Sequence, residues 1–541
     1  MAVALTQASV LVADDAQTVR QSIRLTLGHL GITRVDLTSS IGETRRRLKN
    51  GQYDIVLCDY HFGEGMNGQE LLEELRRTGE LPLTTVWFMI TAEASYEKVV
   101  AVAEVGPDDY LIKPFTGARL SDRLALAWEK KQFLRPLYER ITHGDTSGAL
   151  QMARDLLTTT TDIPYRNDLQ RLLSTLLLED GQLDAARKVF EEILQRRVVP
   201  WARLGLARVY NRQSRKDEAE AMLKSAIDEH AQYVDAYEEL AALYMADGRL
   251  DEAMAVYDQS LSIAPNNVSR LQKAGNLASM LGQPAKARAM LERAVTYGGN
   301  SSALAPETVL QLALAAKRDN AHGDADRYLR MLSEIGRRKE SFAGQVVGML
   351  ANALFSGRAL DLDPLADFVA ANEFTLELAV SAIMTADFIC APTVPGERAN
   401  PGNAPYRWLR PMAERFITSK YISGLLEGAC GQRAAWAEYV RRLGTDIAEL
   451  NKQSVQLMLA GRFAEAVERA VDAARRTHNN RLMLSATHAI VRYLKSQDVS
   501  LRERNLLLQT ADDFLGRLHG VIEEGVLYSL SDDIDRLAYA N

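Results

Sequence analysis

The sequence predicts a doubly wound α/β domain over residues 1–130, followed by an all-α helical solenoid. Within the first 130 residues, short apolar runs alternate with segments of helical period, the pattern of a buried parallel sheet with helices on both faces. After Trp128 these runs stop, and small residues recur every 33 or 34 positions. Because 541 residues exceed what one hydrophobic core usually serves, we expect several domains.

The composition indicates a soluble globular protein, with 47% apolar and 25% charged residues. A net charge of −7 argues against affinity of the whole protein for nucleic acid or an anionic membrane. Cys58, Cys390 and Cys430 form no CxxC pair, so neither a disulfide framework nor a zinc site is expected. The apolar runs 346–355 and 376–391 are too short to cross a bilayer, and the start of the chain lacks the basic region of a signal peptide. These properties predict a cytoplasmic protein without membrane insertion.

The α/β segment contains five apolar runs, each expected to form one strand. They lie at residues 10–13, 34–38, 55–58, 86–90 and 110–112. Helical patterns lie between them and are clearest at residues 18–30, 42–49 and 69–77. Ligands of such sheets bind just beyond the carboxyl ends of the strands. The residues that follow each strand are therefore the candidates for a site.

Acidic, hydroxyl and ammonium groups stand at these strand ends. Asp14 and Asp15 follow the first strand, and Asp59 follows the third. Thr91 follows the fourth strand and Lys113 the fifth. Three carboxylates in one cleft repel each other unless a hard cation lies among them, and Mg²⁺ prefers such oxygen ligands. A phosphoryl group beside Lys113 and Thr91 would use the remaining donors, so the pattern favours attack by a carboxylate on a phosphoryl donor.

This segment resembles the chemotaxis-type receiver domain of two-component response regulators, which has a flavodoxin-like fold. The resemblance rests on the acidic pair Asp14 and Asp15, on Asp59 in LCDYHF, on Thr91 in MITA and on KPF at Lys113. It implies that Asp59 is the phospho-acceptor and that a sensor histidine kinase is the partner that supplies the phosphoryl group. A receiver-like domain with a decayed pocket is the alternative, although none of these residues is missing.

The resemblance also implies a metal site. Asp15 and Asp59 would bind Mg²⁺, and Asp14 would assist through a water molecule. The backbone carbonyl of His61 would add a further ligand. The His61 imidazole is expected to be solvated. The alternative is that it affects the water that attacks the phosphoryl group.

Two residues are implied to respond to phosphorylation. Lys113 would pair with a phosphoryl oxygen, Thr91 would move toward it, and Tyr110 would be the switch aromatic that turns inward. Beyond transfer of the phosphoryl group to Asp59 and its hydrolysis, we expect no enzymatic activity. The HExxH, GxSxG, P-loop and GGDEF-like patterns are all absent from the sequence.

The segment after Asp59 contains a GxGxxG pattern at Gly63, Gly65 and Gly68. A dinucleotide-binding fingerprint belongs after the first strand, with an acid about twenty residues further on. Here the pattern follows the third strand instead. We therefore interpret these glycines as residues that let the loop after Asp59 turn tightly, and we expect no nicotinamide cofactor.

A repeat of 33 or 34 residues extends over residues 131–335. Its units share a small residue in the second helix and a turn residue five positions earlier. The small residues are Ala186, Ala219, Ala253 and Ala287, and the turn residues are Gly181, Ser214, Gly248 and Gly282. Partial copies around Gly144 and Ala149, and around Gly323 and Ala325, extend the array to five or six units. Because single units cannot bury their faces, the units are expected to stack.

The unit at residues 234–267 resembles a tetratricopeptide repeat. It carries the small, aromatic and proline positions of that pattern at Leu240, Ala241, Tyr244, Gly248, Ala253, Tyr257 and Pro265. The resemblance implies that the groove of the array binds a protein or peptide. The alternative is an array that only spaces its two ends apart.

The remainder of the chain is predicted to be helical. Residues 336–445 form a divergent helical region, interrupted by a Pro- and Gly-rich loop at residues 391–406 that is either functional or a domain boundary. Residues 446–541 form a C-terminal region with repeat character, because Gly461 and Ala466 again stand five positions apart.

The sequence thus predicts a response regulator in which phosphorylation of Asp59 controls a protein-binding array, through docking against the array or through homodimerisation. One alternative is binding of RNA or DNA by arginines of the C-terminal helices, at Arg475, Arg476, Arg481, Arg492, Arg502 and Arg504. Mixed local charge disfavours it, and nucleic acid is not the expected partner. The other alternative is a phosphoryl sink, in which the α/β domain only drains a kinase.

Overall fold

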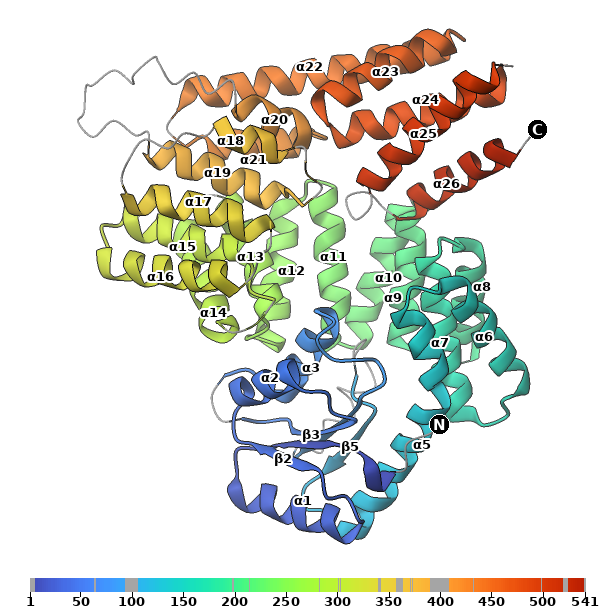
Figure 1. Ribbon diagram of the computed structural model, residues 1–541, viewed down its shortest axis with the longest axis vertical. Helices are drawn as coiled ribbons and strands as arrows, with labels where there is room; N and C mark the ends of the chain where they lie inside the picture. The colour runs from blue at the N-terminus through green and yellow to red at the C-terminus, as the bar shows by residue number, and fades with distance from the viewer. Residues whose placement is uncertain are drawn as a thin grey trace. The chain divides into compact units, whose positions relative to one another are not determined.

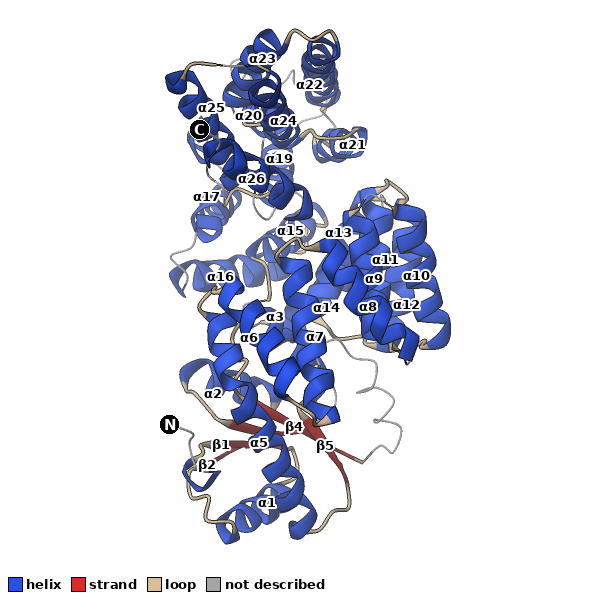
Figure 2. Cartoon of the chain, turned by 90° about the vertical axis from the view of Figure 1, so that its right-hand side faces the viewer, coloured by secondary structure: helices blue, strands red, loops and turns tan. Residues whose placement is uncertain are grey.

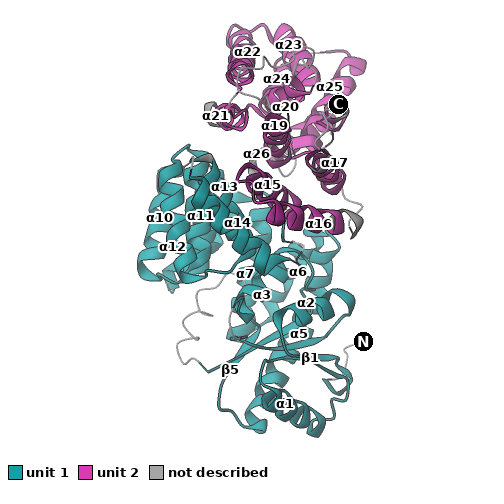
Figure 3. Cartoon of the chain, turned by 90° about the vertical axis from the view of Figure 1, so that its left-hand side faces the viewer, with its two compact units in different colours: residues 1–304 teal, residues 305–541 magenta. Residues whose placement is uncertain are grey.

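The structure, a computed structural model, describes residues 5–62, 65–92, 106–196, 199–213, 215–281, 283–299, 301, 303–338, 342–356, 363–369, 371, 373–389, 408–431, 433–497, 499–518 and 524–539. It divides into two compact units, residues 1–304 and 305–541 (Figure 3). Helices dominate both units, and all described strands lie in the first (Figure 2). Each unit is described by itself.

The first unit begins with the predicted five-stranded parallel sheet (Figure 1). Its strands are β1 (Val10–Ala13), β2 (Val35–Thr38), β3 (Ile55–Asp59), β4 (Val86–Thr91) and β5 (Asp109–Ile112). They lie in the order β2-β1-β3-β4-β5, and neighbouring strands are parallel. The winding reverses between β1 and β3, which is where ligands of such sheets bind. The predicted strands are confirmed, and their observed ends differ from the predicted ones by no more than one residue.

Helices cover the sheet because its central strands are apolar on both faces. β1, β3 and β4 are buried throughout. The described helices of this domain are α1 (Gln17–His29), α2 (Ile41–Asn50), α3 (Gly68–Arg77) and α5 (Gly117–Thr142), with a short 3₁₀ helix at Leu5–Gln7. Leu27 of α1 and Leu120 and Leu124 of α5 share one apolar core with the strands.

Helix α5 joins the α/β domain to the repeats without a break. Leu120 and Leu124 lie in the core of the sheet, whereas Leu134 and Leu137, further along the same helix, lie in the core of the first repeats. The predicted boundary at residue 130 therefore falls inside a helix. One continuous helix is shared by both cores, because apolar residues continue across the boundary and no glycine interrupts them.

The repeats of the first unit are antiparallel helix pairs (Figure 1). The helices are α6 (Thr146–Thr159), α7 (Ile163–Glu179), α8 (Leu183–Arg196), α9 (Pro200–Arg212), α10 (Lys216–Glu229), α11 (Val234–Ala246), α12 (Leu250–Ile263), α13 (Val268–Met280) and α14 (Pro284–Gly298). The predicted turn residues Gly181 and Gly248 have left-handed φ angles of 74° and 75°, which favour glycine. Ser214 and Gly282 lie outside the described residues. The predicted small residues Ala186, Ala219, Ala253 and Ala287 are all buried, as close helix packing requires.

The second unit is all-α in its described parts. Its helices are α15 (Pro306–Arg318), α16 (His322–Arg338), α17 (Phe342–Ser356), α18 (Asp363–Val369), α19 (Leu376–Ile389), α20 (Leu409–Phe416), α21 (Lys420–Ala429), α22 (Ala434–Leu459), α23 (Phe463–Thr477), α24 (Asn480–Ser496), α25 (Leu501–Leu518) and α26 (Glu524–Tyr539). The predicted turn at Gly461 has a φ angle of 73° and precedes buried Ala466. The predicted loop 391–406 lies outside the described residues. None of the described helices combines the length and the apolar character that a bilayer crossing requires.

Candidate functional site

A lysine and two carboxylates meet at the carboxyl edge of the sheet. The Nζ atom of Lys113 lies 2.8 Å from Asp14 Oδ2 and 2.9 Å from Asp59 Oδ2. Both carboxylates are nearly inaccessible, whereas the Lys113 side chain is about one quarter exposed at 24%. The sheet thus brings together residues that are 54 and 99 positions apart in the chain.

Backbone hydrogen bonds fix these strand ends. The N–H of Asp14 donates to the carbonyl oxygen of Thr38 at 3.2 Å, and the N–H of Ala16 donates to Asp14 Oδ1 at 2.8 Å. The N–H of Lys113 donates to the carbonyl of Thr91 at 2.7 Å. The carboxylate and the ammonium group are therefore held by the ladder of the sheet rather than by flexible loops.

Gly68 determines how closely the chain turns after Asp59. A Cβ atom at Gly68 would lie 2.2 Å from the carbonyl oxygen of Asp59, and its neighbours there are a backbone atom and the buried sulfur atoms of Cys58 and Met89. The N–H of Gly68 donates to the carbonyl of Tyr60 at 2.8 Å. Only glycine fits this turn, as the interpretation of the glycine pattern predicted, whereas Gly63 lies outside the described residues.

Burial raises the pKa of Asp59 above the ordinary aspartate value. Hydrogen bonds from Lys113 and from the backbone N–H of His61 act in the opposite direction, and the neighbouring Asp14 adds to the increase. Burial also disfavours the charged form of Lys113, but its hydrogen bonds to Asp14 and Asp59 outweigh this and raise the pKa of Lys113. The ammonium group is therefore charged at neutral pH.

The acidic residues fit a hard divalent cation. One carboxylate oxygen each from Asp14, Asp15 and Asp59 lies within 4.8 Å of the others. Asp15 is exposed, so the group is open to solvent on one side. Oxygen ligands of this kind, with room for water, suit Mg²⁺.

We predict that Mg²⁺ raises the melting temperature of the wild-type protein but not that of Asp59→Asn. A ligand that binds the folded state alone stabilises it, by about 2.7 kcal/mol at a hundredfold excess over Kd. Without Mg²⁺ the Asn variant should be more stable than wild type at neutral pH. A carboxyl whose pKa is higher in the folded chain stabilises the fold at acidic pH and loses that contribution as the pH rises through the folded pKa. Differential scanning calorimetry with and without Mg²⁺ measures both effects, and an equal response of the two proteins to Mg²⁺ would contradict the assignment of Asp59 to the metal site.

The predicted switch residues lie along the neighbouring strands. Thr91 is fully buried at the end of β4, next to β3, which ends at Asp59. Tyr110 in β5 is half-buried, and the guanidinium carbon of Arg123 lies 5.2 Å from the centre of its ring. His61 is exposed and packs edge-on against Tyr60, with 4.7 Å between the ring centres.

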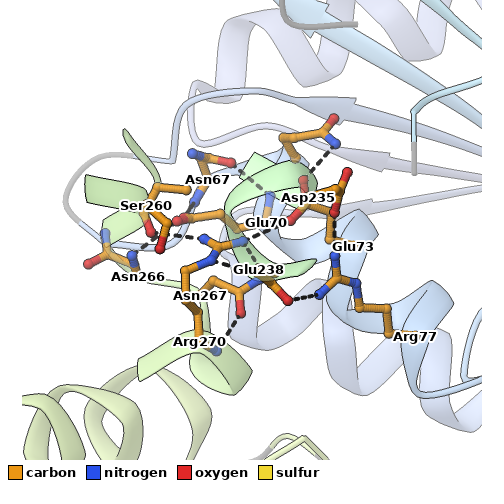
Figure 4. A network of polar contacts seen from close by, with 12 residues as sticks. Asn67, Glu70, Glu73, Arg77, Asp235, Glu238, Ser260, Asn266, Asn267 and Arg270 are labelled. Atoms are coloured by element: carbon orange, nitrogen blue, oxygen red, sulfur yellow. Dashed lines mark hydrogen bonds and ion pairs between the residues drawn. The ribbon is translucent and has the colours of Figure 1, made fainter. Parts of the chain in front are cut away.

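Helix α3 carries a polar surface that was not predicted from the sequence. Arg77 contacts two acidic residues of α11, with Nη2 2.6 Å from Asp235 Oδ1 and Nη1 3.0 Å from Glu238 Oε2. Glu238 in turn binds Arg270 of α13, whose side chain is fully buried (Figure 4). The two partners of Arg77 lie 158 and 161 positions away in the chain, so no local pattern indicates them.

Two family models match the chain. Residues 10–125 match the response regulator receiver domain. Residues 177–244, 212–275 and 244–306 match the tetratricopeptide repeat.

Individual proteins are also similar to parts of this chain. The chemotaxis protein CheY-3 of Vibrio cholerae is 34% identical over 121 residues, which are 22% of this chain and 92% of that protein. The chemotaxis protein CheY of Pseudomonas aeruginosa is 30% identical over 121 residues, covering 22% and 96%. Among solved structures, a CheY-like receiver domain from Methanospirillum hungatei shows 24% identity and a TM-score of 0.21, covering 23% of this chain and 97% of that one. MamA shows 22% identity and a TM-score of 0.25, covering 30% and 93%.

Proposed function

Because this chain belongs to the response regulators, with an N-terminal receiver domain followed by tetratricopeptide repeats, we propose that phosphorylation of Asp59 controls protein binding by the repeats. The observation that carries this proposal is the Lys113 ammonium group held between Asp14 and Asp59, with Asp15 close by. This group of residues fits the binding of a metal ion and a phosphoryl group. A sensor histidine kinase is the proposed phosphoryl donor.

In the proposed reaction a carboxylate oxygen of Asp59 attacks the phosphorus of a phosphohistidine. The new O–P bond forms, the bond from phosphorus to the imidazole nitrogen breaks, and the imidazole keeps the electron pair. Mg²⁺, when bound by Asp15, Asp59 and the His61 carbonyl, would offset the negative charge of the carboxylates and of the transferred group. Lys113 would give up its contact with Asp59 and pair with a phosphoryl oxygen instead. Transfer to Asp59 and later hydrolysis are the only chemistry proposed for the chain.

The repeats are the proposed output. A groove on α8, α9 and α10 combines apolar and charged side chains, as a peptide site requires, and is lined by Leu194, Arg203, Tyr210, Glu218, Ala221, Met222 and Ser225. The first unit also contains direct contacts between the receiver domain and the repeats, through Arg77 and the carboxylates of α11. These contacts are the proposed means by which the state of the receiver domain reaches the repeats.

We predict that the repeats capture a protein from a bacterial lysate in one phosphorylation state only. The two states to compare are the Asp59→Ala variant and wild type loaded with beryllofluoride, which mimics a phosphoryl group on the acceptor. Bound proteins are identified by mass spectrometry. A partner enriched at least tenfold in one state would support phosphorylation control.

The control is a mass measurement after treatment with acetyl phosphate. Wild type should gain one phosphoryl group and Asp59→Ala none. Equal sets of captured proteins in both states would contradict control of the repeats by the receiver domain. No modification of wild type would contradict phosphorylation itself.

A further inference from the structure

A residue of the repeats holds the loop that follows the phospho-acceptor. The side-chain Nδ2 of Asn266, in the turn between α12 and α13, donates to the carbonyl oxygen of Gly65 at 2.7 Å. Gly65 lies six positions after Asp59, on the way to α3. Although the two residues are 201 positions apart, this hydrogen bond joins the two domains beside the candidate site.

Asn266 makes a second contact, to the first turn of α3. Its backbone N–H donates to Glu70 Oε1 at 3.0 Å (Figure 4). The other oxygen of Glu70 accepts from the N–H of Asn67 at 3.0 Å, and the Asn67 side chain accepts from the N–H of Glu70 at 2.8 Å. This reciprocal pair is a capping box. One buried carboxylate therefore serves both the start of α3 and the backbone of the repeats.

The loop also packs closely on the repeats. Gly65 has a φ angle of +124°, and a Cβ atom added there would lie 3.4 Å from Cε1 of Tyr297, on α14. At the sheet side, Gly68 lies against the carbonyl of Asp59. The described parts of the loop are thus held by the sheet at one end and by the repeats at the other.

We propose that Asn266 is a positioning residue of the phosphorylation site, through which the repeats set the affinity of that site for Mg²⁺ and for a phosphoryl group. Asn266 holds the Gly65 carbonyl three positions before Gly68, whose backbone lies against the carbonyl of Asp59, and so limits how the chain can move beside the phospho-acceptor. Coupling between two sites is reciprocal, so occupation of the Asp59 site changes the docking of the repeats by the same free energy. The inference rests on the proposed function, and it gives the receiver domain a contact with the repeats that involves neither Thr91 nor Tyr110.

The test uses Asn266→Ala in the full chain. This variant loses the hydrogen bond to Gly65 and the one that Asn266 Oδ1 accepts from Arg293 Nη2 at 3.3 Å, but it keeps the backbone N–H that binds Glu70. We expect Mg²⁺ affinity, measured by isothermal titration calorimetry, to fall by about three- to tenfold. This factor corresponds to the free energy that one hydrogen bond contributes. Amide hydrogen exchange of a peptide that spans the loop should become faster without metal, while the melting temperature of the metal-free protein stays within about 2 °C of wild type.

Two further variants define the cause. Asn266→Asp keeps an acceptor for Arg293 but replaces the N–H donor with a carboxylate oxygen beside the Gly65 carbonyl and Glu70, so its loss of Mg²⁺ affinity should equal or exceed that of Asn266→Ala. Gln232, exposed and 34 positions earlier, occupies the matching position of the preceding repeat. Gln232→Ala should bind Mg²⁺ like wild type.

The outcomes separate the inference from the proposed function. Wild type that binds Mg²⁺, with Asn266→Ala and Asn266→Asp of unchanged affinity, would overturn the positioning role alone. An equal loss in Gln232→Ala would also overturn it. Wild type that binds neither Mg²⁺ nor beryllofluoride would overturn the proposed function.

Discussion

Glu74→Ala is expected to lower the free energy of unfolding by about 3–5 kcal/mol, because it leaves a buried arginine without its counter-charge. The Nε atom of Arg45, on α2, lies 2.8 Å from Glu74 Oε1, on α3, and Arg45 Nη2 donates to Glu74 Oε2 at 3.1 Å. The two side chains are only 4% and 3% exposed. Water cannot replace the carboxylate at this depth. The variant also loses the hydrogen bond from Ser301 Oγ to Glu74 Oε1, 2.6 Å long, which joins α3 to the end of the repeats.

Urea denaturation followed by circular dichroism measures the effect. The double variant Arg45→Met with Glu74→Leu should recover most of the loss, since two apolar residues of similar size do not need a charge partner. Asp184→Ala is the matched control, because Asp184 is 79% exposed and its pair with Arg187 is worth less than about 1 kcal/mol. A loss below about 1 kcal/mol in Glu74→Ala would show that Arg45 finds another partner or reaches solvent.

The candidate site could be predicted from the sequence because its geometry follows from the sheet. Parallel strands bring their carboxyl ends to one edge, so Asp14, Asp59 and Lys113 had to meet once the strands were located. Strand positions were clear since the central strands are apolar on both faces. The close turn at Gly68 could likewise be anticipated from its place after Asp59, and the structure gives the reason, a carbonyl oxygen where a Cβ atom would be.

The contact between the domains could not be predicted, because its charges carry no local pattern. The side chains of Glu73 and Glu238 are only 13% and 11% exposed where α3 meets the repeats, and nothing in the sequence near either residue indicates this. Burial raises the pKa of Glu73. Burial also disfavours the ionised form of Glu238, but Arg270 and Arg77 outweigh it and lower the pKa of Glu238 to about 2. Such pairs form only after the fold brings the helices together.

At one end of the repeat array, the observed turn residue also differs from the one that the sequence suggested. The sequence suggested Gly323 as a marker of the last partial repeat, but Gly323 lies within α16. The left-handed residue is Asn320, with a φ angle of 57°, five positions before buried Ala325. Asparagine tolerates this conformation nearly as well as glycine. The spacing of five positions was therefore the reliable signal, and the identity of the turn residue was not.

Lys113→Met is expected to slow phosphorylation of Asp59 by about 100- to 1000-fold, the usual effect of removing one preorganised charged donor from a site of developing negative charge. Lys113 contacts the carboxylates of both Asp14 and Asp59, and its raised pKa keeps it charged at neutral pH. Methionine preserves most of its apolar length and removes only the ammonium group. The rate is followed by intact-protein mass spectrometry during treatment with acetyl phosphate at saturating Mg²⁺.

The same substitution should weaken the fold less in the presence of Mg²⁺ than in its absence. Without Lys113, the carboxylates of Asp14 and Asp59 lose their counter-charge. A bound Mg²⁺ ion then supplies the positive charge that offsets their repulsion. Lys49→Met is the control, since Lys49 is half-exposed and lies 3.7 Å from Glu80, away from the strand ends. A rate within threefold of wild type would show that Lys113 takes no part in phosphoryl transfer. Its contacts with Asp14 and Asp59 would then be purely structural.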